Sequence, residues 1–144
     1  IGFIHTPFTR FLIIEQIARE VREDTVNYDD SSPAKLALRN GAQVPVEFTF
    51  STSCPDTAWS CLTIRRGSFP ERLSGADTRV ISAQFLISPA QDPFQFSLDT
   101  GSYLSDSQPR VTVALSLDNG ENEGDPNYIR YDVQTTISSR AYRR

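Results

Sequence analysis

The stretch YIRYDVQTTIS, residues 128–138, decides the fold of this chain. Its residues alternate between two sides, with Val133 and Ile137 on one side and Asp132 and Gln134 on the other. A period of two is typical of a strand that has one face on a core and the other in water, as in antiparallel sheets. We therefore predict that the chain closes an antiparallel sheet here, just before its basic end AYRR.

Further strand-like stretches fill the chain after Pro33. They are KLALRNGAQVPVEFTF (35–50), CLTIRR (61–66), RVISAQFLIS (79–88), FQFSL (94–98) and RVTVALSL (110–117). Alternation predicts an apolar face in several of them, formed by Val44, Val46, Phe48 and Phe50, by Ile81, Ala83, Phe85 and Ile87, and by Phe94, Phe96 and Leu98. Asn40-Gly41 is a strong signal for a hairpin turn.

The stretch FTRFLIIEQIAREVRED, residues 8–24, has apolar residues at the spacing of a helix. The stripe expected to dock this helix on the sheet consists of Phe11, Ile14, Ile17 and Val21. Thr6 followed by Pro7 predicts an N-cap and a first helical turn. We expect the helix to end near Val26, where the turn formers NYDDSSP begin.

One helix followed by a series of strands predicts an α+β fold, in which an N-terminal amphipathic helix packs on an antiparallel β-sheet. The chain has 144 residues, which is the length of one ordinary domain. We expect a single domain over residues 1–144, with the helix at 8–26 and the β-sheet region at 34–142.

Composition argues against several classes of function. The net charge of −4 argues against a nucleic-acid-binding protein, which usually carries a basic patch. The chain has no run of about 18 apolar residues that could span a bilayer. His5 is the only histidine and the motif G-x-S-x-G does not occur, so a His-based hydrolase is not expected. We predict no catalytic, cofactor or metal site.

The two cysteines lie in the stretch CPDTAWSC. Cys54 and Cys61 enclose Pro55 and Asp56, a spacing that suits a loop disulfide in an oxidising compartment. Closing so small a loop stabilises a protein by about 2 to 3 kcal/mol in the chain-entropy model. Two free thiols are the alternative, and a closed zinc site would need four ligands.

Four segments, taken in order, resemble a known family. They are RFLIIEQIAREVRED (10–24), LALRNGAQVPVEFTF (36–50), QPRVTVALSL (108–117) and VQTTISSR (133–140). They resemble the globular heads of type IV pilin-like proteins, and most of all the minor pilins and the J-type minor pseudopilins of type II secretion. The resemblance covers residues 8–142 and implies a pilin-like fold with VQTTISSR as its closing strand.

The start of the chain departs from the pattern of this family. Its members begin with a Gly-Phe processing site and about 25 apolar residues, enough to cross a membrane, with a glutamate at the fifth mature position. Gly2-Phe3 does not fit, because the position of that glutamate falls on Pro7. The resemblance thus implies that the membrane half of a longer helix is missing and that residues 8–26 are its C-terminal half.

The resemblance also implies a function without catalysis or cofactors. The missing segment would anchor a structural subunit in the inner membrane and would later pack against other pilin or pseudopilin subunits in an extracellular or cell-envelope filament. Such a filament serves adhesion, motility, DNA uptake or secretion. Assembly through the helix would require an exposed apolar face wider than a monomer needs, which Phe8, Leu12 and Ile13 are expected to supply.

The acidic stretch DNGENEGDPN (118–127) is a candidate calcium loop. Its oxygen donors are Asp118, Glu121, Glu123 and Asp125. The spacing of an EF-hand fails, because Gly120 and Glu123 stand where an Asp or Asn and a Gly are required. A solvated hairpin loop is the alternative interpretation.

Trp59, inside the predicted disulfide loop, is a candidate partner contact. The alternative is that it folds back over the edge of the sheet. An alternative function for the whole chain is a secreted or surface-exposed carbohydrate- or protein-binding β-rich module. That function predicts exposed aromatic residues grouped on one face, such as Trp59, Tyr103 and Tyr142.

Overall fold

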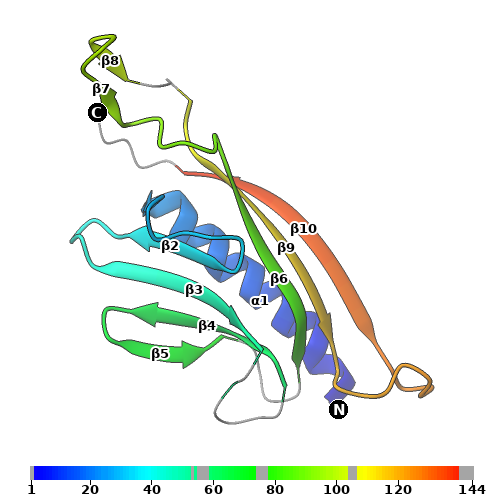
Figure 1. The fold of residues 1–144 in the computed structure, drawn as a ribbon. Coiled ribbons are helices and arrows are strands. Elements are labelled where there is room, and N and C mark those ends of the chain that lie inside the picture. Colours follow the sequence, from blue (N-terminus) through cyan, green and yellow to red (C-terminus); the bar gives the residue numbers. More distant parts are fainter. Residues whose placement is uncertain (1, 53, 55–58, 74–77, 104–106, 140–144) are drawn as a thin grey trace.

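A computed structural model describes residues 2–52, 54, 59–73, 78–103 and 107–139, and of residues 2–11 it describes the backbone alone. This part of the chain contains one helix and ten strands (Figure 1). In chain order these are α1 (Gly2–Glu23), β1 (Thr25–Val26), β2 (Lys35–Arg39), β3 (Pro45–Ser51), β4 (Cys61–Arg66), β5 (Phe69–Arg72), β6 (Arg79–Ser88), β7 (Phe96–Ser97), β8 (Ser102–Tyr103), β9 (Arg110–Asp118) and β10 (Arg130–Ser138).

The strands form three antiparallel sheets. The largest has five strands in the order β1-β2-β3-β4-β5, so each strand pairs with its neighbour in the chain. The second has three strands in the order β10-β9-β6, and β7 and β8 form a separate hairpin. One backbone hydrogen bond connects the second sheet to the segment that leads into β2, because Phe85 N of β6 donates to the Pro33 carbonyl at 2.9 Å.

The predicted fold class, an α+β fold of the pilin-like kind with one helix packed on one sheet, is wrong. The described chain is mostly β and contains a five-stranded antiparallel sheet. The reason is that β6 pairs with β9 and does not extend the first sheet beyond β5, so β6, β9 and β10 form a second sheet that faces the first across the core. Sequence alternation predicts the faces of strands but not their partners.

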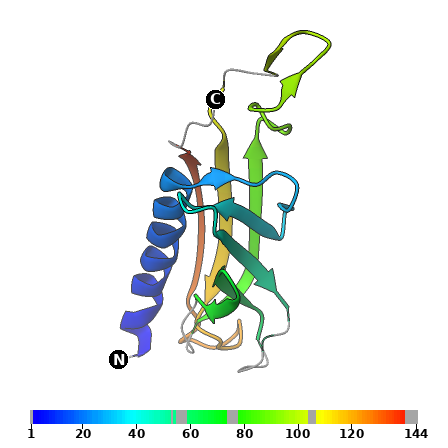
Figure 2. The same ribbon diagram turned by 90° about the vertical axis from the view of Figure 1, so that its left-hand side faces the viewer.

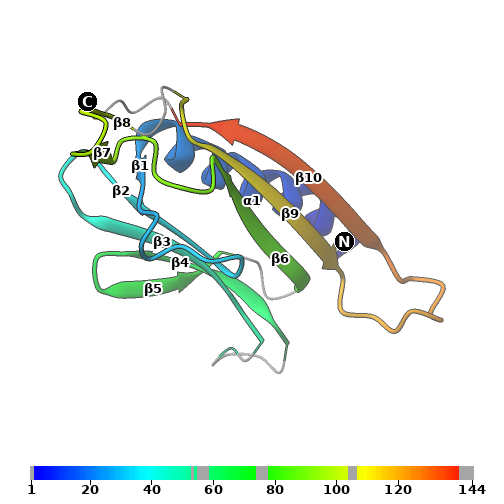
Figure 3. The same cartoon turned by 45° about the horizontal axis from the view of Figure 1, so that its top comes forward.

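The core lies mainly between these two sheets. Phe48 and Leu62 of the five-stranded sheet share one buried cluster with Phe85 and Leu115 of the three-stranded sheet. The helix runs along one side of the molecule, where it contacts β10 and β9 (Figures 2 and 3). It therefore completes one border of a core that the sheets largely form.

The bounds of the helix differ from the prediction at both ends. It begins at Gly2, so that Thr6 and Pro7 lie inside it and the predicted N-cap is wrong. It ends at Glu23 and not near Val26. Asp24 N still donates to the Glu20 carbonyl at 2.8 Å, but Thr25 and Val26 then pair with β2. Strand pairing thus ends the helix before the turn formers are reached.

Two of the strand predictions are confirmed. The closing strand exists as β10, which pairs with β9 from Arg130 to Ser138. The hairpin at Asn40-Gly41 joins β2 to β3, and the Asn40 side-chain oxygen accepts hydrogen bonds from the backbone N–H groups of Ala42 and Val44 at 2.9 and 3.0 Å. These bonds hold the turn and leave Val44 exposed before the strand begins.

Two other predictions require correction. The register of β6 shifts between Val80 and Ser82, which buries Val80 and leaves Ile81 only half-buried. A bulge of this kind moves the residues before it to the other face, so simple alternation fails there. The stretch 94–98 is not a core strand, because only Phe96–Ser97 forms β7 and Leu98 is 90% exposed. The β7–β8 hairpin projects from one end of the molecule (Figure 1).

Candidate functional site

The docking face of α1 is shifted from the predicted stripe. Ile17 and Val21 are buried as expected, and Ile14 is half-buried against the core. Phe11, the fourth predicted residue, lies outside the part of the chain whose side chains are described. Ile13 was expected to widen the exposed face, but it is fully buried in the core. Leu12 remains on the outer face, where it is 49% exposed.

Two carboxylates continue this buried stripe toward the end of the helix. Glu20 is 7% exposed and Asp24 is 3% exposed, although charged residues are rarely buried without partners. Glu20 follows Ile17 by three positions and Asp24 follows Glu20 by four, which places all three on one side of the helix. Because of this helical spacing, the side chains of Glu20 and Asp24 are buried at the edge of the core.

Arg66, at the end of β4, provides the cation for this pair. Its guanidinium forms an ion pair with the Glu20 carboxylate, while half of its side chain stays exposed. Burial by itself raises the pKa of Glu20, but hydrogen bonds with Asp24 and Arg66 outweigh burial, so that the net shift of this pKa is downward. Glu20 is therefore the ionised member of the pair.

Asp24 lies in a different environment. Burial, and then hydrogen bonding with Glu20 and repulsion by its charge, raise the pKa of Asp24 to about 7. Its Oδ2 atom has no hydrogen-bond partner in the described part of the chain. Its backbone carbonyl accepts a hydrogen bond from Ser139 Oγ at 2.9 Å, which ties the end of the helix to the residue after β10.

The burial of Glu20 and Asp24 was not predicted, although the helical spacing of the sequence carries a signal for it. Positions 13, 17, 20, 21 and 24 follow the spacing of one helix face, so burial of the first two and of Val21 implies burial of Glu20 and Asp24. The identity of the cation could not be found in this way, because Arg66 reaches the helix only through the pairing of β4 with β3.

The predicted disulfide is confirmed. Cys54 and Cys61 are joined, their Cα atoms are 6.3 Å apart, and both side chains are buried. Cys61 begins β4, so the bridge fixes the chain at the point where the strand enters the sheet. A disulfide of this kind is typical of proteins of oxidising compartments, which here means the extracellular space or the cell envelope.

Trp59 packs against the loop between β9 and β10. A Cβ atom added to Gly120 would lie 2.4 Å from Trp59 Cη2, so the indole ring lies directly over this glycine. Gly120 also has a φ of +81°, a conformation that favours glycine. Trp59 thus closes over the neighbouring loop and is only half-exposed, while residues 55–58 beside it lie outside the described chain.

The candidate calcium loop is built around a buried ion pair. Asp118 is fully buried and accepts hydrogen bonds from Arg79 Nε at 3.0 and 3.2 Å and from Arg79 Nη2 at 2.5 Å. Tyr128 Oη and Gly120 N also donate to it, at 3.2 and 2.9 Å. Both carboxylate oxygens of Asp118 therefore already accept hydrogen bonds from protein donors. Within the described residues, no group of three or more acidic, His or Cys side chains could hold a metal ion.

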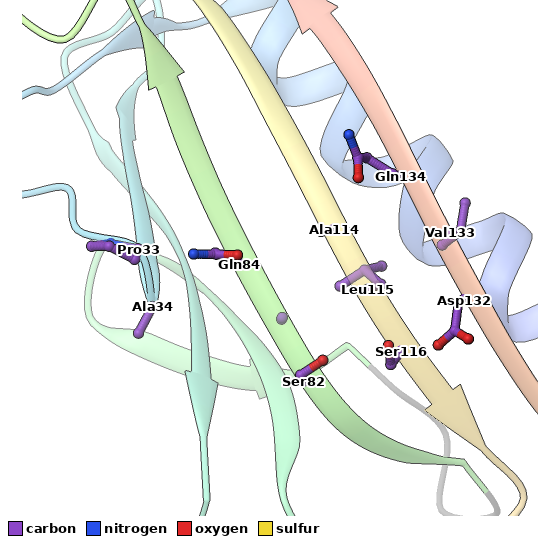
Figure 4. Close-up of a pocket in the computed structure, with 11 residues that line it drawn as sticks. Pro33, Ala34, Ser82, Gln84, Ala114, Leu115, Ser116, Asp132, Val133 and Gln134 are labelled. Atoms are coloured by element: carbon purple, nitrogen blue, oxygen red, sulfur yellow. The ribbon is translucent and has the colours of Figure 1, made fainter.

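A shallow groove of about 590 Å³ crosses the outer face of the three-stranded sheet. Figure 4 shows Gln84 of β6 and Gln134 of β10 on either side of Ala114, whose small side chain leaves the hollow between them. Two residues before Gln134 on β10, Asp132 lies opposite Ser116 of β9. Hydrogen bonds from Ser116 and Arg130 lower the pKa of Asp132. The groove therefore offers carboxamide, hydroxyl and carboxylate groups but no aromatic side chain.

The aromatic residues of the alternative function do not share one face in the described chain. Trp59 precedes β4, whereas Tyr103 ends β8, and these elements lie at opposite ends of the molecule (Figure 1). Tyr103 packs edge-on against Phe96 with 5.4 Å between the ring centroids. Tyr142 lies outside the described residues.

Neither a family model, a curated protein nor a solved structure matches this chain. Within the described residues, no helix is both long enough and apolar enough to cross a membrane.

Proposed function

We propose that this protein is a non-enzymatic structural subunit of an extracellular or cell-envelope filament, of the minor pilin or pseudopilin kind, and that it assembles through α1. Its partners would be other subunits of the filament. The observation that carries the proposal is the position of α1, which runs along one side of the molecule with one face buried and with Leu12 49% exposed on the other.

Two further observations support this proposal. The four segments that resemble type IV pilin-like proteins include the helix and the closing strand, and these two elements contact each other. The Cys54–Cys61 disulfide agrees with a place outside the cytoplasm. The β7–β8 hairpin adds exposed apolar side chains, such as Leu98, at the opposite end from the start of the helix.

Photo-crosslinking in the source organism tests the proposal. A photoreactive amino acid at Leu12 should cross-link to neighbouring subunits, because an assembled helix face lies within a few ångströms of its partner. The matched control carries the same amino acid at Glu71, which is exposed on β5 and lies outside the groove described above. Equal cross-linking from both positions, or none from Leu12, would contradict assembly through the helix.

The gene offers an independent check. Codons upstream of Ile1 should encode a Gly-Phe site and about 20 apolar residues with an early glutamate, since such a segment can span a membrane. An ordinary cleavable signal peptide or a second folded domain in that place would contradict the filament proposal.

The groove supports a second candidate function, a carbohydrate- or protein-binding module. Gln84 and Gln134 each present a carboxamide beside Ala114, and such groups hydrogen-bond to hydroxyl-rich or peptide ligands. Replacing Ala114 with Leu would fill the hollow from an exposed face without disturbing the core. A glycan or peptide array that detects binding by the wild type and not by this variant would favour the module.

A further inference from the structure

The C-terminal end of α1 holds more buried negative charge than its surroundings neutralise. Glu20 and Asp24 lie together on the helix, and one guanidinium, that of Arg66 in β4, forms an ion pair with Glu20. On α1 itself Arg19 attracts Glu20, whereas Glu23 repels Asp24. From the segment after β10, Ser139 contributes a hydroxyl that donates to a backbone carbonyl and not to a carboxylate.

A single proton on the Glu20–Asp24 pair leaves the pair with one negative charge, which matches the one positive charge of Arg66. With one proton shared by the two carboxyl groups, one negative charge faces Arg66 and the protonated carboxyl can donate to the other. Without it, a second negative charge is buried while Asp24 Oδ2 has no donor in the described chain. A buried charge without a partner costs several kcal/mol, which the surrounding structure can relieve only by opening to water.

The same cluster joins three segments that are distant in the sequence. Glu20 connects α1 to the end of β4 through Arg66, and Asp24 connects α1 to Ser139 after β10. Any opening that hydrates Asp24 must therefore loosen the end of the helix from one or both of these neighbours.

We propose that the Glu20–Asp24 pair is a proton-operated latch, which fastens the C-terminal end of α1 to β4 and to the segment after β10 in mildly acidic surroundings and loosens it as the pH rises. The latch does not depend on the proposed filament function, since it concerns the attachment of the helix within one molecule.

The sign of the pH dependence follows from the ionisation of Asp24. Its pKa is about 7 in the folded protein and close to the ordinary aspartate value of 3.8 when unfolded. The folded state therefore binds more protons between these values, and stability falls as the pH rises through this range. Glu20 has a lowered pKa and acts in the opposite direction only at more acidic pH, so the latch loosens as the pH rises toward about 7 and the dependence levels off above that value.

Urea unfolding of the wild type and of Asp24→Asn between pH 5 and pH 8.5 tests the latch. The unfolding equilibrium constant of the wild type should rise by up to about tenfold per pH unit below pH 7. Asp24→Asn should lose this dependence, because its amide donates to Glu20 at every pH. Asp132→Asn is the matched control, since Asp132 is an exposed carboxylate on β10, and it should keep the wild-type dependence.

Two further measurements on the wild type keep the proposal open to refutation even if Asp24→Asn does not fold. The side-chain carboxyl carbon of Asp24 should titrate in NMR with a midpoint near 7, and amide hydrogen exchange of residues 20–24 should lose protection above that pH. A midpoint below 5, unchanged protection, or an Asp24→Asn variant that follows the wild-type pH dependence would each overturn the latch.

Discussion

Asp24 and Asp118 are both buried beside an arginine, but the protein completes their hydrogen bonding very differently. Asp118 accepts hydrogen bonds on both oxygens, from Arg79, Tyr128 and Gly120. Near Asp24 the guanidinium of Arg66 forms its ion pair with Glu20, and Asp24 Oδ2 has no donor among the described residues. The comparison teaches that the supply of donors, and not burial alone, decides whether a buried carboxylate forms a permanent anchor or a site sensitive to protons.

The largest effect is expected from removing the cation of the complete site. Arg79→Met should lower the free energy of unfolding by about 3 to 5 kcal/mol, because it leaves the fully buried Asp118 without its charge partner. Urea unfolding at pH 7 measures this change. A loss below about 1 kcal/mol, the range of an exposed pair, would show that the two aspartates are not as different as we describe.

The next effect concerns the glycine that donates to Asp118. Gly120→Ala should cost about 2 to 3 kcal/mol, since the new Cβ combines a strained positive φ with a clash against Trp59. Gly67→Ala is the matched control, with a φ of +70° but ordinary contact at 3.9 Å, and it should cost about 1 kcal/mol. Fluorescence of Trp59, the only tryptophan, should change in the first variant alone. Equal costs would mean that the indole ring moves aside freely.

A third variant removes the cation of the incomplete site. Arg66→Met leaves two buried carboxyl groups without a guanidinium, so we expect a loss of about 2 kcal/mol at pH 8. At pH 5 the loss should be much smaller, because protonation can neutralise Asp24 and relieve Glu20. Unfolding curves at the two pH values measure the difference. A loss of the same size at both pH values would show that the site of Arg66 is no more sensitive to protons than the site of Arg79.

The smallest effect is expected at an exposed pair. Arg130 Nε lies 3.1 Å from Asp132 Oδ1 at the surface of β10. Water and salt screen such a pair, so Arg130→Ala should leave the urea midpoint unchanged within error. A clear fall in that midpoint would show that this exposed ion pair stabilises the protein in spite of screening by water and salt.

Much of the local structure could be predicted from the sequence because it depends on neighbouring residues. The turn at Asn40-Gly41, the alternation of β9 and β10 and the disulfide of Cys54 and Cys61 all follow from local chemistry or short spacing. The predictions failed where a distant partner intervened. Pairing with β2 ended the helix at Glu23, and the register shift between Val80 and Ser82 changed the buried face at the start of β6 alone.

The candidate sites show the same division. The spacing of Ile17, Glu20 and Asp24 already places two acidic groups on the buried face of the helix. It does not show that Arg66 of β4 forms an ion pair with Glu20 or that Ser139 donates to the Asp24 carbonyl.

Local sequence patterns were enough to predict β3, β9 and β10 as strands and the turn at Asn40-Gly41, because these features arise from the period of the side chains and from turn chemistry. Only the tertiary structure decided that the strands divide into two sheets that share a core, with α1 along one side. It also decided that Asp118 receives donors on both oxygens, while Asp24 Oδ2 has no donor among the described residues. Residues far apart in the chain come into contact only when the sheets pack, and no local sequence pattern predicts which of them will do so.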